Sequence, residues 1–137
     1  MSEMGRNPVF VFGSNESGVH GAGAAAYARK HYGAVLGVGE GPTGNSYALP
    51  TKGLAPTLPT RSLSDVQDSV ANFISYALAN PQLTFRVTAV GCGLAGFTNR
   101  QIAPLFETAP DNCLMPPEWV GFAELERFNF WRYEDYV

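Results

Sequence analysis

The sequence predicts an α/β protein whose strands run mainly parallel. The first observation is a strand, a glycine loop and a helix in succession between Pro8 and Tyr32. The second is the same succession from Leu83 onwards, where the run LTFRVTAV passes directly into GCGLAGF. Right-handed crossovers in such a pattern bring the carboxyl ends of parallel strands to one edge of a sheet. Both glycine loops should therefore lie at that edge, where open α/β sheets bind ligands.

Length and composition indicate a single domain. The 137 residues are 45% apolar, which is enough for one hydrophobic core and too few for two domains. We expect a body over residues 8–126 and an aromatic tail over 127–137. A net charge of −3 lacks the basic excess of a sequence-independent nucleic-acid binder, so we expect a small-molecule partner instead. The polar start at Met1–Asn7 and the lack of a long apolar run predict a cytoplasmic protein without membrane contact.

The first glycine loop follows a strand that should be buried on both faces. Val9–Phe12 is β-branched and aromatic without polar alternation, as in the inner strands of parallel sheets. Glycines at 13, 18, 21 and 23 then allow close backbone approach. An alanine-rich helix over Gly21–Tyr32 should begin at this loop and stop at Gly33. Amides that converge where such a helix begins favour a negatively charged group, and a diphosphate fits there.

The middle of the chain predicts one irregular segment, one short strand and one long helix. Residues 34–45 contain glycines and a proline that interrupt any period, so we expect an extended, partly irregular segment at the surface. In Ser46–Thr51, Pro50 restricts the strand to a sheet edge or a strand end, and Lys52 follows at its tip. Ser62 and Asp65 form a capping box for a helix that ends at Asn80-Pro81. Its apolar stripe comprises Val66, Val70, Phe73, Ile74, Ala77 and Leu78.

The last third predicts two strands, two helices and a docked tail. A strand over Leu83–Val90 precedes the second glycine loop, and Thr98 with Gln101 caps a short helix. Asn112–Met115 is predicted as the last strand and Glu118–Glu126 as a helix. The tail FNFWRYEDYV is too aromatic to remain in solvent, so it should dock on the body or form a homo-oligomer contact.

One familiar motif can be set aside by its context. Residues 21–26 fit the dinucleotide fingerprint GxGxxA, and Glu40 stands near the position of a ribose-binding acid. In that motif the first glycine ends the strand, whereas here SNESGVH separates Gly13 from Gly21. The segment therefore does not predict a nicotinamide-type site.

Three pieces of sequence, in this order, resemble the macrodomain family. They are SNESGVHGAGAAAYARKHYG, then YALPTK followed by a capped helix, then VGCGLAGF. The resemblance covers roughly Pro8 to Phe106 and is strongest to the branch that contains the terminal ADP-ribose protein glycohydrolase. It implies a three-layer α/β/α fold with a mixed, mainly parallel sheet. It also implies that an ADP-ribose-like nucleotide binds between the two glycine loops.

The resemblance implies a ligand site made mostly of backbone amides. In the family, the GAG-type turn and the GCGL-type loop face each other across the diphosphate and the distal ribose. Asn15 either bonds a ribose hydroxyl or caps its turn. Phe97 either stacks on the ligand, which the resemblance favours, or anchors the loop. The predicted ligand-binding residues are Asn15, Gly21, Ala22, Gly23, Gly91, Cys92, Gly93, Leu94, Ala95, Gly96 and Phe97.

The resemblance to the glycohydrolase branch also implies hydrolysis of an ADP-ribosyl or related phosphoribosyl linkage. In that branch a lysine after the edge strand attacks the distal ribose, and Lys52 takes this position. An aspartate in the second loop assists, but Ala95 falls at its place. His20 is the second catalytic candidate, as a general base or phosphate partner, although a structural hydrogen bond is an equal alternative. The family's adenine-binding Gly-Asp pair has no counterpart before Pro8, so adenine recognition is not carried over.

The two cysteines predict reduced thiols and no metal or cofactor. Neither Cys92 nor Cys113 has a metal-type neighbour at CxxC or CxxH spacing. Cys92 lies in the second loop, where a nucleophile is one reading and a small buried thiol the commoner one. An alternative function is a non-catalytic interaction module that keeps the macrodomain fold without its ligand and contacts a partner through the aromatic tail.

Overall fold

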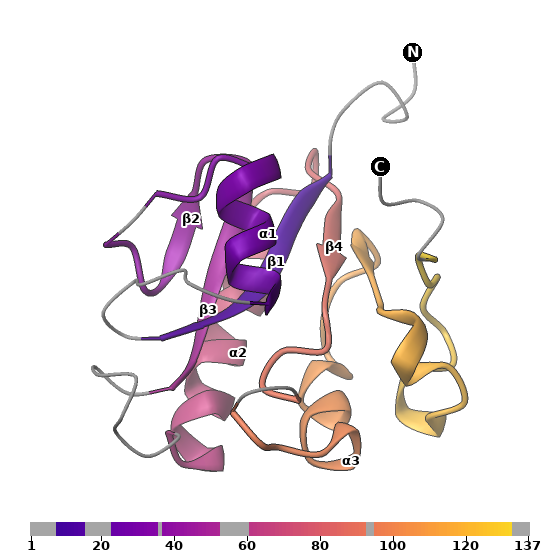
Figure 1. The fold of residues 1–137 in the computed structure, drawn as a ribbon. Coiled ribbons are helices and arrows are strands. Elements are labelled where there is room, and N and C mark those ends of the chain that lie inside the picture. Colours follow the sequence, from indigo (N-terminus) through magenta and orange to yellow (C-terminus); the bar gives the residue numbers. More distant parts are fainter. Residues whose placement is uncertain (1–7, 16–22, 36, 53–60, 93–94, 133–137) are drawn as a thin grey trace.

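The computed structural model describes residues 8–15, 23–35, 37–52, 61–92 and 95–132, which form a five-stranded sheet (Figure 1). The strand order is β2-β3-β1-β4-β5. The strands are β1 Val9–Asn15, β2 Gly41–Thr43, β3 Ser46–Lys52, β4 Phe85–Val87 and β5 Cys113–Leu114. β1 runs parallel to β3 and β4, β4 runs parallel to β5, and β2 is antiparallel to β3. The prediction of a mixed, mainly parallel sheet is confirmed.

Helices cover the two faces of the sheet, which confirms the three-layer architecture. The helices are α1 Gly23–His31, α2 Leu63–Ala79 and α3 Asn99–Ile102. Successive side chains of a strand point to opposite faces. Phe10 and Phe12 of β1 accordingly pack with α1, while Val9 and Val11 join the larger core beneath α2. Figure 1 shows α1 in front of the sheet and α2 behind it.

The long helix α2 starts and ends where the sequence predicted. The Ser62 hydroxyl accepts from the Asp65 amide at 3.1 Å, and Asn80 ends the helix. Phe73 is fully buried and makes ring contacts with Tyr47, Phe85 and Phe106. Leu78 was wrongly assigned to the apolar stripe, because it is 61% exposed. None of the helices in the described ranges is long and apolar enough to cross a lipid bilayer.

Of the two positions predicted from Pro50, the sheet edge is wrong because β3 lies inside the sheet, whereas the strand end agrees with the position of Pro50 near the end of β3. The edge is β2, which belongs to the segment predicted to be irregular and pairs with residues 46–48 of β3. Phe10 N donates to Asn45 O, so the odd-numbered residues of this strand direct their backbone polar groups to β1. Pro50, which has no N–H, is even-numbered, so no hydrogen bond to β1 is lost. Pro50 therefore faces away from β1, beyond the end of β2. Its carbonyl accepts from Arg61 Nη1 at 2.8 Å.

Two elements near the second half of the sheet are shorter than predicted. The strand expected over Leu83–Val90 is only β4 with its flanks, because the chain turns back at Val90, whose amide donates to Thr88 O. The strand expected over Asn112–Met115 is reduced to β5. The helix expected over Glu118–Glu126 is wrong. The segment forms two 3₁₀ turns, η3 Pro117–Trp119 and η4 Ala123–Leu125, and Gly121 with φ of 98° lies between them.

The described part of the aromatic tail packs on the body. We call residues 127–132 the C-terminal strap. Met115 N donates to Asn129 O at 2.9 Å, and Trp131 N donates to Met115 O at 3.1 Å. These bonds place the strap along the outer edge of β5. Phe128 and Trp131 are both buried, and homo-oligomer contact through the rest of the tail stays a prediction.

The core beneath α2 predicts a clear contrast between two residues of the same helix. Phe73→Ala should lower the free energy of unfolding by about 3–5 kcal/mol, because it opens a cavity among the surrounding rings. Leu78→Ala should change it by less than about 0.5 kcal/mol, because the side chain is mostly in solvent. Urea denaturation of both variants measures this. Equal losses would show that the packing of α2 is wrongly described.

Candidate functional site

Two parallel strands end side by side, and the segment after a third reaches the same place. β1 and β3 end at Asn15 and Lys52, whereas β4 ends at Val87, opposite Val11, and the chain after it brings Gly91 close to Gly13. A register shift between Ser14 and Asn15 sets Asn15 opposite Lys52. The sequence placed both residues in the site, and the structure brings their backbones together on adjacent strands. This edge is the candidate functional site.

The first strand and the loop after β4 touch through their backbones. A Cβ added to Gly13 would lie 3.3 Å from Gly91 N and 3.4 Å from Thr51 Oγ1. A Cβ on Gly91 would lie 3.0 Å from Phe97 Cδ2 and 3.3 Å from Thr51 Cγ2, and Gly91 itself has φ of 77°. A side chain at Gly13 would require its neighbours to shift by a few tenths of an ångström, and one at Gly91 would in addition have to adopt a positive φ. The ends of β1 and β3 and the second glycine loop thus form one tight junction.

Hydroxyl groups brace this junction internally. The Thr51 hydroxyl donates to Ser14 O at 3.4 Å, and the Ser14 hydroxyl donates to Gly39 O in the loop before β2. The Thr88 hydroxyl donates to Val11 O at 2.7 Å. All three side chains are buried. They fix the strand ends relative to one another before any ligand arrives.

The second glycine loop closes on itself. Phe97 N donates to Gly91 O at 2.8 Å, and Cys92 N donates to Ala89 O at 3.1 Å. Because both amides are used inside the loop, they are unsuited to bind a ligand. The predicted amide donors of this loop therefore narrow to residues 93–96, of which Gly93 and Leu94 lie outside the described residues. Beyond the loop, Thr98 and Gln101 form the predicted capping box of α3.

Cys92 has the properties of a structural thiol. Burial raises its pKa to about 11, and the nearby carboxylate of Glu118 adds to this effect. At neutral pH the sulfur is therefore protonated and a poor nucleophile. Its Sγ lies 3.6 Å from Val90 O, which it can donate to. Cys113 is fully buried on β5, as expected for a core residue.

The remaining predicted site residues fall into two groups. Lys52 is partly exposed at the end of β3, and Phe97 is partly buried against the core beneath α2. Gly23 is the first residue of α1, and Figure 1 shows this end of α1 toward the end of the sheet where β1 and β3 end. Outside the described residues lie His20, Gly21, Ala22, Gly93 and Leu94. In the described part of the chain, no group of three or more acidic, cysteine or histidine side chains could hold a metal ion.

Sequence reasoning missed two residues of the junction. Gly13 was noted only as one of several glycines. The available signal was that Gly13 and Gly91 each directly follow a predicted strand. Thr51 was treated only as part of a strand. Its contact with both glycines depends on the β1–β3 register, which no local pattern contains.

Two glycines of the second loop predict a measurable difference in steric tolerance. Gly91→Ala should cost the strain of a positive φ, about 1–2 kcal/mol, and a further 1 kcal/mol or more for the contact with Phe97. Gly96→Ala should cost the strain alone, because its φ is 86° with nothing within 4 Å of the added Cβ. Thermal denaturation of both variants compares them. A Gly96 variant that is as unstable as the Gly91 variant would contradict the tight junction.

Comparison with known proteins supports the fold. No protein-family model matches the sequence, and no curated protein matches it. One solved structure that resembles it is described as a protein of unknown function from Bacteroides thetaiotaomicron. The TM-score is 0.52 at 16% sequence identity, with 74% of this chain and 80% of that chain covered. At this identity the likeness establishes a shared fold and carries no information on ligand or activity.

Proposed function

We propose that this chain binds an ADP-ribose-like nucleotide at the edge where β1 and β3 end beside the loop that follows β4. The observation that carries the proposal is the backbone contact between Gly13 and Gly91, which joins the two glycine loops at their bases. Loops that leave neighbouring parallel strands at one edge form the crevice in which open α/β sheets bind ligands. The macrodomain resemblance of the same two loops gives the ligand class.

The chemistry at this edge supports a ligand with a diphosphate. Among the described side chains of the junction, Ser14 and Thr51 are hydroxyl groups with internal partners, and Lys52 supplies a positive charge. The helix α1 begins at Gly23, after the first loop, and directs its positive dipole end to this side. A diphosphate bound by amides, a helix start and one ammonium group needs no metal ion in this arrangement.

The position of Phe97 supports a sugar or base next to the diphosphate. Its ring packs against Gly91 at the junction and keeps part of its surface in solvent. An aromatic face at the rim of a polar site is a common platform for ribose or base stacking. The two roles predicted for Phe97, anchoring the loop and stacking on the ligand, are compatible because the same ring packs at the junction and keeps an exposed surface.

Hydrolysis of the bound nucleotide is a separate hypothesis. It assigns the attack on the distal ribose to Lys52, with help from His20 and without the carboxylate that Ala95 replaces. General acid–base help typically contributes about 10²- to 10⁴-fold to rate. The described residues 14–15, 51–52, 91–92 and 95–97 contain no carboxylate. We therefore propose binding as the function and leave turnover as a consequence to be measured.

The two lysines of the chain offer a matched test of the binding site. Calorimetry with ADP-ribose should detect binding to the wild type and a loss of affinity of about tenfold or more in Lys52→Gln, because a charged hydrogen bond to the ligand is removed. Lys30→Gln should bind normally, because Lys30 is exposed in the last turn of α1, remote from the strand ends.

Two results would contradict the proposal. The absence of heat and of a thermal shift at millimolar ADP-ribose would leave the interaction module as the remaining function. Equal loss in the two lysine variants would show that the ligand responds to net charge rather than to this site.

A further inference from the structure

Both tryptophans of the chain donate their indole N–H groups to the ends of the second glycine loop. Trp131 Nε1 donates to Val87 O at 2.6 Å, where β4 ends and the loop region begins. Trp119 Nε1 donates to Asn99 Oδ1 at 2.9 Å, where the loop has ended and α3 begins. Both indoles are buried, at 2% and 0% exposure. The loop is therefore held from both sides by residues that come after it in the sequence.

The Trp131 bond fills a gap in the parallel ladder. Phe85 N donates to Asn112 O, so the odd-numbered residues of β4 direct their backbone polar groups to β5. If the ladder continued with this alternation, Val87 O would accept a hydrogen bond from the amide of residue 116. That residue is proline and has no N–H. Trp131 supplies the missing donor to a carbonyl that is buried in the sheet.

The C-terminal strap holds the Trp131 ring in position. Its backbone is tied to Met115 on both sides of Phe130, through Asn129 O and Trp131 N. The Arg86 guanidinium lies 5.8 Å from the centre of the Trp131 ring, and its Nη1 lies 3.5 Å from the Tyr32 hydroxyl. Arg86 thus connects the strap to the side of the sheet covered by α1. The strap therefore lies along the outer edge of β5, and the Trp131 side chain reaches Arg86 and Val87 of β4.

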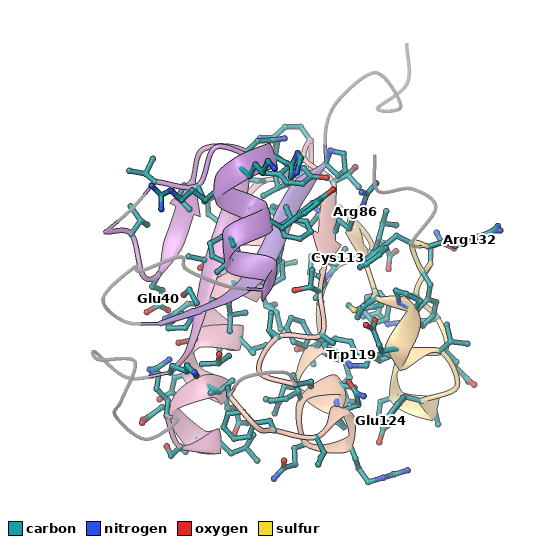
Figure 2. All side chains as sticks on the ribbon, viewed as in Figure 1. Glu40, Arg86, Cys113, Trp119, Glu124 and Arg132 are labelled. Carbon is teal, nitrogen blue, oxygen red and sulfur yellow. The ribbon has the colours of Figure 1, made fainter. Side chains whose placement is uncertain are left out.

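Trp119 holds the far end of the loop. Its ring packs on Phe106 with a centroid distance of 5.2 Å, within the core beneath α2. Figure 2 shows Trp119 between η3 and the region of α3. Phe97 ends the loop, Thr98 is the capping residue, and Asn99 is the first residue of α3. The position of Phe97 therefore depends on this hydrogen bond as well as on its own bond to Gly91 O.

We propose that Trp131 and Trp119 are positioning residues for the second glycine loop, and that docking of the C-terminal strap and ligand binding are coupled through this loop. The inference rests on the proposed function for its ligand. The indole N–H groups bind Val87 O and Asn99 Oδ1, which lie outside the junction of Gly13, Thr51 and Gly91. Loss of either donor should therefore act on the junction through an end of the loop.

Hydrogen exchange tests the positioning without any ligand. Trp131→Phe keeps an aromatic ring, smaller than the indole, and removes the indole donor. The amides of Val90 and Phe97, which donate within the loop region, should exchange about tenfold faster or more, while that of Val70 in α2 changes little. The control is Leu78→Ala, a substitution at an exposed position of α2 that leaves the strap and both indole bonds intact. Uniform acceleration of all amides in Trp131→Phe, or none, would overturn the inference.

A second arm measures ADP-ribose affinity in the same variants. Trp131→Phe should bind about tenfold more weakly, and Leu78→Ala should bind within about twofold of the wild type. If wild-type protein does not bind, the proposed function fails while hydrogen exchange still decides the positioning. If Trp131→Phe does not fold, Trp119→Phe gives the same test at the other end of the loop. Normal affinity in a variant whose loop amides exchange faster would overturn the coupling.

Discussion

The contact between the end of β1 and the loop after β4 is the constraint on which the candidate site depends. A Cβ added to Gly13 would lie 3.3 Å from Gly91 N, and a Cβ added to Gly91 would lie 3.0 Å from the ring of Phe97 and 3.3 Å from Thr51 Cγ2. The contact sets the distance between the two glycine loops at their bases. Thr51, from the neighbouring strand, closes the same junction and brings Lys52 to its rim. Backbone closeness, rather than a cluster of charges, defines this edge.

The C-terminal third of the chain supports that edge from a distance. β5 is only two residues long, and the proline that follows cannot continue the ladder to β4. An indole from the strap takes over the lost hydrogen bond, and a second indole fixes the start of α3. The segments after β5 are therefore part of the framework of the second glycine loop. Trp119 and Trp131 are both buried, which agrees with this role.

Local patterns sufficed for the central strands, the capped helix α2 and the capping box of α3. In each, side-chain periodicity or a cap decides the structure within a few residues. Pairing between distant segments decided the rest. β2 formed in a glycine-rich segment because residues 46–48 offered a free edge, and the helix expected over Glu118–Glu126 gave way to turns around Gly121. The roles of Thr51 and Trp131 likewise depend on strand register and a missing donor, which no local pattern contains.

The central claim is that a nucleotide binds where β1 and β3 end beside the loop that follows β4. Amide chemical shifts of the protein, recorded as ADP-ribose is added, test it most directly. The account predicts saturable shifts concentrated at Gly13, Thr51, Gly91 and Phe97. It predicts none at the shallow depression lined by Asp111, Arg127, Phe128 and Asn129, which the strap forms with the turn before β5. Shifts confined to that depression, or no shifts at any concentration, would contradict the account.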